Sequence, residues 1–268
     1  MSWNLIRKTV SDRWRSTAIY AGAISAYLLM TAAIFPTFQK ISGIQDVINK
    51  YPKDLLKFFG VQNFDITSFN SYLVVEFLGV IWVVIAAAYI IAFARNMVSG
   101  ELHDGTLEFL LAQPIERWKV LTSEGLVLLG GIIGLVVVTV VSIFAWGAAF
   151  GLKITYSGYA NFIPIGVALF AAIAGYSIFF SAVFSDPRHS AMAAAGLTLV
   201  FYLVHFGGAY SKFFEKVDWF GIFHYYDPLK VLNSGTVPVK SVLLLLAFAV
   251  VGFAAALWVF QRRDITTT

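Results

Sequence analysis

Six long apolar stretches divide the chain, and each is about the length of a transmembrane helix. A helix rises 1.5 Å per residue, so about 20 apolar residues are needed to cross a bilayer. The pattern therefore predicts six membrane-spanning helices. The predicted spans are Thr17–Phe35, Tyr72–Ala94, Val120–Phe150, Phe162–Phe184, Ser190–Gly208 and Ser241–Phe260.

The third predicted span is longer than one perpendicular crossing requires. Counted from Pro114 to Phe150, a continuous helix would be about 55 Å long. We therefore expect it to tilt, or to project beyond the membrane at its Pro114 end. Within it, Gly130 and Gly134 are small residues one turn apart, and such pairs permit close contact between helices.

Residues 1–16 have the spacing of an amphipathic helix that precedes the first span. Its apolar face would consist of Trp3, Ile6, Val10 and Trp14. Basic residues flank this face, so we expect the helix to lie on the membrane surface. The long loops at 36–71 and 209–240 are expected to carry short helices at the opposite surface. The predicted fold is an all-α integral membrane protein with one transmembrane domain, residues 1–268.

Composition agrees with a membrane protein. Hydrophobic residues make up 59% of the chain and charged residues 13%, against roughly 45–50% and 25% in soluble domains. Because the chain has no cysteine, disulfides, thiolate metal sites and cysteine nucleophiles are excluded. The net charge of +4 fits contact with a membrane surface better than nucleic-acid binding, which favours a strongly basic face.

The distribution of basic residues gives the expected orientation. An even number of spans places both termini on one side of the membrane. With the termini inside, the inner segments hold ten of the 19 Lys and Arg residues, including every arginine. Short inner segments carry most weight in the positive-inside rule. We therefore expect a multi-pass protein of the plasma (inner) membrane with both termini cytoplasmic.

The polar segment 95–119, between the second and third spans, is the densest cluster of charge and capping residues in the chain. Gly105 and Thr106 suit a turn and a helix start, and Pro114 would end the short helix and begin the next. Its apolar stripe would be Leu107, Leu110 and Leu111, and its acidic stripe Glu101, Asp104 and Glu108. Periodicity alone leaves two interpretations open, a helix that docks into a partner and a solvated loop helix.

The amino-acid sequence of this segment closely resembles the cytoplasmic coupling segment of ABC-2 type transporter permeases. The resemblance rests on Arg95, Glu101, the run from Gly105 to Pro114, and Arg117. Weaker similarities occur at Tyr51-Pro52, at Tyr225-Tyr226-Asp227-Pro228 and at Phe260-Gln261-Arg262-Arg263-Asp264. These permeases are six-span subunits of ATP-driven exporters, and the resemblance covers nearly the whole chain.

The resemblance implies specific partners. The short helix would seat in a groove of a separate ABC ATPase, with two ATPase copies and a second permease subunit in the complex. ATP and Mg²⁺ would bind to the ATPase, since this chain lacks the G-x-x-x-x-G-K-[ST] phosphate loop. We expect no cofactor or metal on this chain and no catalytic role. The coupling residues would be Glu101, Asp104, Gly105, Thr106, Leu107, Glu108, Leu110, Leu111, Pro114 and Arg117.

Two ionisable residues near the outer ends of spans could line a transport path. Glu76 lies about one turn inside the second span and His205 near the end of the fifth. Intramembrane ionisable groups are candidates for function, although side chains at this depth can also stay hydrated. The rival interpretation is a secondary transporter or channel subunit. Such proteins have midplane charges or broken helices, and neither is evident in this sequence.

Overall fold

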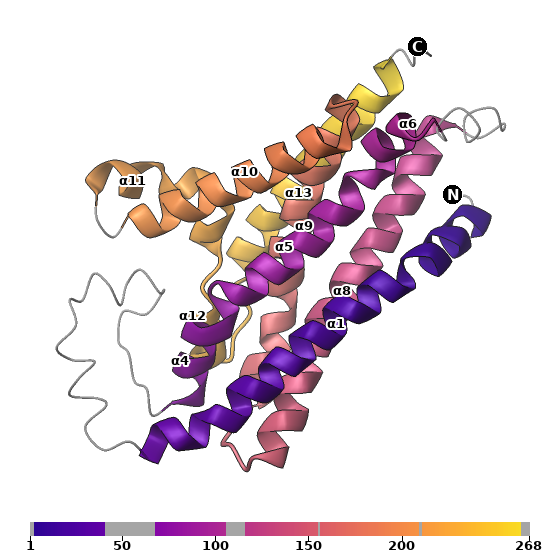
Figure 1. Ribbon diagram of the computed structural model, residues 1–268. Coiled ribbons are helices and arrows are strands. Elements are labelled where there is room, and N and C mark those ends of the chain that lie inside the picture. The colour runs from indigo at the N-terminus through magenta and orange to yellow at the C-terminus, as the bar shows by residue number, and fades with distance from the viewer. Residues whose placement is uncertain (1–2, 41–67, 106–115, 155, 209–210, 264–268) are drawn as a thin grey trace.

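The computed structural model describes residues 3–40, 68–105, 116–154, 156–208 and 211–263. Within these ranges every regular element is a helix. Six long helices are apolar enough to cross a membrane, which confirms the predicted number of spans (Figure 1). They are α1 (Trp3–Lys40), the composite helix 69–103, α8 (Arg117–Ala149), α9 (Tyr156–Val183), α10 (Pro187–Gly207) and α13 (Val239–Arg262).

Helix α1 differs from the sequence-based expectation because it runs without a break from Trp3 to Lys40. We expected a separate surface helix over 1–16. The junction contains no glycine or proline, and Thr17 donates its hydroxyl to the carbonyl of Arg13 within the same helix, at 3.2 Å. Nothing at this point stops the helical backbone. The predicted surface helix and the first span are therefore one helix.

The second span is interrupted, which the sequence analysis did not anticipate. It consists of α4 (Phe69–Leu73), the π-helix η1 (Val74–Leu78), α5 (Ile81–Ala94), the π-helix η2 (Asn96–Gly100) and α6 (Glu101–His103). The helix breaks at Val80, whose φ of −127° is not helical. Tyr226 donates its hydroxyl to the carbonyl of Leu78 at 3.0 Å. The Leu78 carbonyl next to the break therefore has a hydrogen-bond partner, which backbone groups inside a membrane require.

Helix α9 lies at the centre of the bundle, with α5, α8, α10 and α13 packed around it. The largest buried side chain in its neighbourhood is Trp82 of α5, which packs against Phe162 and Phe170 of α9 at centroid distances of 5.2 and 4.5 Å. The indole of Trp82 donates to the hydroxyl of Thr139 on α8 at 2.8 Å. One aromatic side chain thus joins three spans.

Glycines bring α9 and α13 into backbone contact. A Cβ atom added at Gly175 would lie 2.6 Å from the carbonyl oxygen of Ala249, and one added at Gly252 would lie 2.6 Å from the backbone of Gly175. Only residues without a side chain permit this approach. Among the described elements, α9 and α13 also make the most extensive helix–helix contact.

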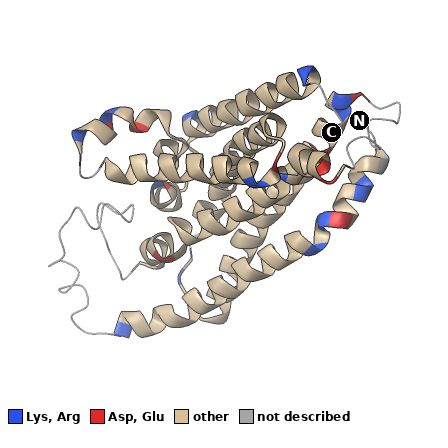
Figure 2. Cartoon of the chain, turned by 45° about the horizontal axis from the view of Figure 1, so that its top comes forward, with Lys and Arg blue, Asp and Glu red and all other residues tan. Residues whose placement is uncertain are grey.

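Different segments form the two ends of the bundle. The N-terminal end of α1, the C-terminal end of α13 and α6 lie together at one end (Figure 1). Charged residues gather near the ends of the helices, and the middle of the bundle is almost free of them (Figure 2). The opposite end carries the segment after α10, which contains α11 (Lys212–Val217), η3 (Asp218–Phe220), η4 (Ile222–Tyr225) and α12 (Pro228–Ser234).

Candidate coupling site

The candidate site is the end of the bundle from which residues 95–119 project. The structure describes Glu101, Asp104, Gly105 and Arg117 among the predicted coupling residues. The others lie outside the described residues, namely Thr106, Leu107, Glu108, Leu110, Leu111 and Pro114. The described part therefore consists of the two ends of the segment, where it leaves α6 and where it enters α8.

The first end of the segment turns where the sequence predicts a turn. Helix α6 stops at His103, and Gly105 has a φ of +70°, a conformation that side-chain-bearing residues rarely adopt. Asp104 is exposed, whereas Glu101 is half-buried. The two described acids of the predicted stripe thus have different surroundings, and Asp104 is the more exposed of the two.

A serine of α9 holds the backbone just before this turn. The hydroxyl of Ser181 accepts hydrogen bonds from the amides of Val98 and Ser99, both at 3.2 Å, and it lies 3.3 Å from the carbonyl of Arg95. Ser99 also donates to the Arg95 carbonyl at 2.6 Å. A π-helix leaves amides without regular α-helical partners, and Ser181 supplies one. This contact ties the segment's first end to α9.

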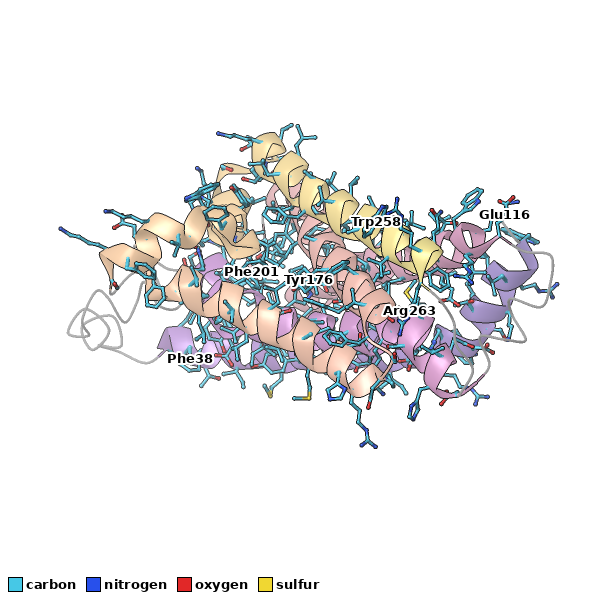
Figure 3. The ribbon with its side chains drawn as sticks, turned by 90° about the horizontal axis from the view of Figure 1, so that it is seen from above. Phe38, Glu116, Tyr176, Phe201, Trp258 and Arg263 are labelled. Atoms are coloured by element: carbon cyan, nitrogen blue, oxygen red, sulfur yellow. The ribbon has the colours of Figure 1, made fainter. Side chains whose placement is uncertain are left out.

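Two arginines tie the second end of the segment to α13 and α9. Arg117, the first residue of α8, donates to the carbonyl of Arg263 at 2.7 Å. Arg263, at the end of α13, donates in turn to the carbonyl of Ala182 at 2.7 Å and to that of Phe184 at 3.2 Å. Figure 3 shows Arg263 beside the end of α9. Both ends of the coupling segment are therefore connected to the C-terminal end of α9.

Glu124 is a buried acid that the sequence analysis overlooked. It lies within the third span, and its side chain is only 8% exposed. Its carboxylate interacts electrostatically with Glu101 and with the positive charges of Arg13 and Lys8 on α1. Because Glu124 is a lone acid one turn inside an apolar span, the sequence alone could have identified it as a candidate functional residue. The structure shows in addition that it interacts with Glu101.

The turn between α9 and α10 lies at the same end. Asp186 caps α10 by accepting from the amide of Arg188 at 2.7 Å. This hydrogen bond lowers the pKa of Asp186 below its usual value. His103 of α6 also contributes to the electrostatic environment of Asp186. The N-cap of α10 is sufficient to explain why an aspartate occupies this position, since aspartate is favoured at the start of a helix.

The two predicted pathway residues have different partners. Glu76 lies in η1 and accepts a hydrogen bond from Tyr27 of α1 at 3.0 Å. His205 lies near the C-terminal end of α10, with its Nδ1 3.0 Å from Asp218. Asp218 also contacts His224 at 2.6 Å. Burial alone would raise the pKa of Asp218, but the hydrogen bonds to the two histidines outweigh it, so that pKa is lowered.

Comparison with known families decides the identity of the chain. The family model of the ABC-2 family transporter proteins matches residues 3–265. The chain belongs to this family. None of the curated proteins compared with it matches.

The chain is therefore the membrane component of an ABC transporter, and it consists of transmembrane helices. ABC-2 permeases generally pair with ATPase subunits and are typically non-catalytic themselves. In the described ranges, no group of three or more His, Asp or Glu side chains could hold a metal ion.

Proposed function

We propose that this ABC-2 protein is the membrane subunit of an ATP-driven exporter and that segment 95–119 docks onto a separate ATPase. The observation that carries the proposal is the connection of both ends of the segment to α9. Ser181 binds the backbone at the first end of the segment. At the second end, Arg117 donates to the carbonyl of Arg263, whose side chain binds the end of α9. A force on the segment would therefore act on the central helix of the bundle.

The proposed complex contains two copies of the ATPase and two permease subunits. Six helices rarely both enclose a path and shield it from lipid, so a second subunit is required. ATP and Mg²⁺ belong to the ATPase. On this proposal both termini are cytoplasmic, and they lie at the same end of the bundle as α6. Asp104 is an exposed acid at that end, and it would meet a basic group of the ATPase.

The test is co-purification followed by ATP hydrolysis. The chain is expressed with the ATPase encoded beside it, captured by a tag on Thr268 and reconstituted into vesicles. We expect the complex to hydrolyse ATP and the chain alone to show no hydrolysis. Asp104→Lys should reduce the amount of ATPase captured several-fold, because a charge reversal at an interface places like charges together.

A matched control is Glu215→Lys, which makes the same charge change on the exposed surface of α11 at the other end of the bundle. It should capture as much ATPase as the unmodified chain. Equal capture with Asp104→Lys would remove this residue from the interface. Hydrolysis by the chain alone, abolished by substitution within it, would contradict the proposal as a whole.

The break at Val80 favours an alternative function. Interrupted helices and intramembrane carboxylates are features of secondary transporters, and Glu76 lies within one turn of this break. A Glu76→Gln variant distinguishes the two functions. If export follows an ion gradient without ATP and stops in this variant, the secondary-transporter interpretation is correct.

A further inference from the structure

One carboxylate joins two histidines in the segment that follows α10 (Figure 1). Asp218 is the first residue of η3, and its Oδ1 atom lies 3.0 Å from Nδ1 of His205 at the C-terminal end of α10. Its Oδ2 atom lies 2.6 Å from Nδ1 of His224 in η4. The Asp218 side chain is only 15% exposed, whereas those of His205 and His224 are 29% and 45% exposed. Three elements thus meet at these three residues, which we call the His–Asp–His cluster.

The two imidazoles are the charged partners of this carboxylate. Among the described residues, Asp218 forms ion pairs with them alone. The other charged side chains on the elements around the cluster are exposed, so that water and salt screen them. These side chains are Lys212, Glu215 and Lys216 of α11, Asp227 at the start of α12 and Lys240 of α13. The neighbouring Tyr202 and Tyr225 carry phenols, which ordinarily ionise only near about pH 10. Histidine is the side chain whose charge ordinarily changes between about pH 5 and pH 8, so pH in this range acts on the cluster through its imidazoles.

The short helix η4 connects the cluster to the break in the second span. On one side of His224, Phe223 is buried against the ring of Tyr202 on α10, at a centroid distance of 5.3 Å. On the other side, Tyr226 donates its hydroxyl to the carbonyl of Leu78 beside the break. The cluster therefore lies two residues from the group that satisfies the broken backbone, and a shift of η4 would reach that hydrogen bond.

The packing of η4 against α10 contains one unsatisfied group. The hydroxyl of Tyr202 is buried and has no hydrogen-bond partner within the described part of the chain. A buried hydroxyl without a partner costs free energy. This cost weakens the contact beside Phe223, so the attachment of η4 to α10 depends more strongly on the His–Asp–His cluster.

We propose that the His–Asp–His cluster is a pH-sensitive switch, in which charged imidazoles hold η4 against α10 and loss of their charge loosens η4 and the break in the second span. A protonated imidazole attracts the carboxylate, whereas a neutral imidazole retains only a weaker hydrogen bond. The contact is therefore strong in mild acid and weakens as the pH rises. This switch goes beyond the proposed function and does not depend on an ATPase.

The weakening at higher pH belongs to the histidines rather than to Asp218. The pKa of Asp218 lies below its ordinary value of about 4, so this carboxylate stays ionised between about pH 5.5 and pH 8. Two charged contacts that are partly exposed contribute enough attraction for about a fivefold change in the population of the loosened state.

The experiment is hydrogen exchange of the full chain in detergent micelles, with protection expressed relative to the intrinsic exchange rate at each pH. Between about pH 5.5 and pH 8, protection of residues 218–226 should fall about fivefold. Protection of residues 81–84, the first turn of α5 after the break, should fall over the same range. Constant protection of residues 218–226 throughout this range would overturn the proposal.

Matched histidine variants identify the groups that titrate. The double variant His205→Gln and His224→Gln keeps a donor beside each carboxylate oxygen and removes both charges. Its protection should be independent of pH in this range and equal to that of the unmodified chain at about pH 8. Each single variant should keep part of the change. His189→Gln is the control, because His189 lies 3.8 Å from Asp186 at the other end of α10, and it should keep the full change. An unaltered response in the double variant would exclude the cluster as the switch.

A further variant tests the connection to the break. Tyr226→Phe removes the hydrogen bond to the Leu78 carbonyl and leaves the His–Asp–His cluster in place. Residues 218–226 should keep their response to pH, whereas residues 81–84 should have low protection at every pH and no response. If residues 81–84 respond equally in Tyr226→Phe and in the unmodified chain, the cluster does not act on the break through Tyr226, and that part of the proposal is wrong.

Discussion

At the scale of single residues, Ser177 and Ser181 show that two serines of one helix can form hydrogen bonds with different elements. They lie one turn apart on α9, and both are buried. Ser177 donates to the carbonyl of Ile173 in its own helix at 2.7 Å. Ser181 instead binds the backbone of η2. The sequence analysis identified neither as part of the site, because a serine in an apolar helix usually bonds to its own backbone.

We expect Ser181→Ala to destabilise the protein by about 1–3 kcal/mol, because two buried amides lose their partner. Ser177→Ala should change stability by less than about 1 kcal/mol, since the carbonyl of Ile173 keeps its helical bond. Thermal unfolding of the purified variants in one detergent measures both. Equal unfolding temperatures for the two variants would show that Ser181 does not anchor η2.

The arginines at the end of α13 give a second residue-scale prediction. Arg263→Gln removes the donor that binds the end of α9. In the reconstituted complex, we expect ATP hydrolysis to continue while export per ATP falls several-fold. Arg262→Gln is the control, because Arg262 lies over the ring of Trp258 at 4.5 Å and its loss leaves the α9 contact in place. Normal export per ATP in Arg263→Gln would exclude this residue from coupling.

At the scale of elements, α9 and α13 are in backbone contact through their glycines. Gly175→Ala would place a methyl group against the carbonyl of Ala249. Overpacking of this kind costs about 1–3 kcal/mol. Gly196→Ala, in open space on α10, should be neutral or stabilising by up to about 1 kcal/mol, since alanine is the better helix former. Thermal unfolding distinguishes the two, and equal stability would contradict the close approach of α9 and α13.

The segment after α10 is expected to respond to acid through Asp218. Because the folded state lowers its pKa, the contribution of Asp218 to stability is fully present above about pH 4 and is lost as the pH falls through the lowered value. Protection of α11 and η3 from hydrogen exchange, measured relative to the intrinsic exchange rate at each pH, should fall in that acidic range. Asp218→Asn should show low protection at every pH and no such transition. Protection in the unmodified chain that stays constant through this range would contradict the role of Asp218.

At the scale of the whole molecule, periodicity and length predicted the six spans correctly. The break at Val80 was not predictable from its neighbours. Its apolar residues match an uninterrupted helix, and the stabilising hydroxyl of Tyr226 is distant in sequence. The contacts of Ser181 and Arg263 depend in the same way on tertiary packing. Glu124, in contrast, could have been found, since it is a lone acid within a predicted span.

The orientation of the whole bundle is testable because the chain contains no cysteine. Single cysteines are introduced at Gly105, Lys53 or Lys216, and intact cells are treated with a membrane-impermeant maleimide. We expect labelling at Lys53 and Lys216 and protection at Gly105. Permeabilised cells provide the control, because all three sites should then react. Labelling of Gly105 from outside would end the coupling proposal, since a cytoplasmic ATPase could not reach it.

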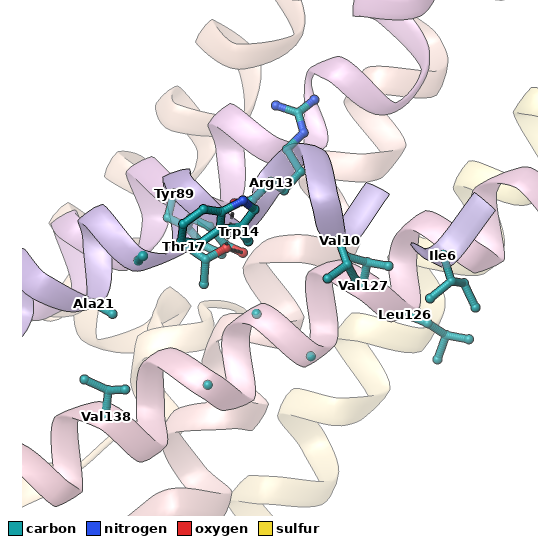
Figure 4. A pocket seen from close by; sticks show the side chains of 14 residues that line it. Ile6, Val10, Arg13, Trp14, Thr17, Ala21, Tyr89, Leu126, Val127 and Val138 are labelled. Atoms are coloured by element: carbon teal, nitrogen blue, oxygen red, sulfur yellow. Dashed lines mark hydrogen bonds between the residues drawn. The ribbon is translucent and has the colours of Figure 1, made fainter. Parts of the chain in front are cut away.

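The continuity of α1 has a mechanical consequence. A helix of 38 residues is about 57 Å long, and the hydroxyl of Thr17 meets that of Tyr89 at 3.0 Å part-way along it (Figure 4). If α1 pivots at this contact, the arm toward Lys40 is roughly one and a half times as long as the arm toward Trp3. A displacement of the short arm by about 2 Å would then move the far end by about 3 Å. A shift of α1 at one face of the membrane would thus change the position of the chain at the opposite face.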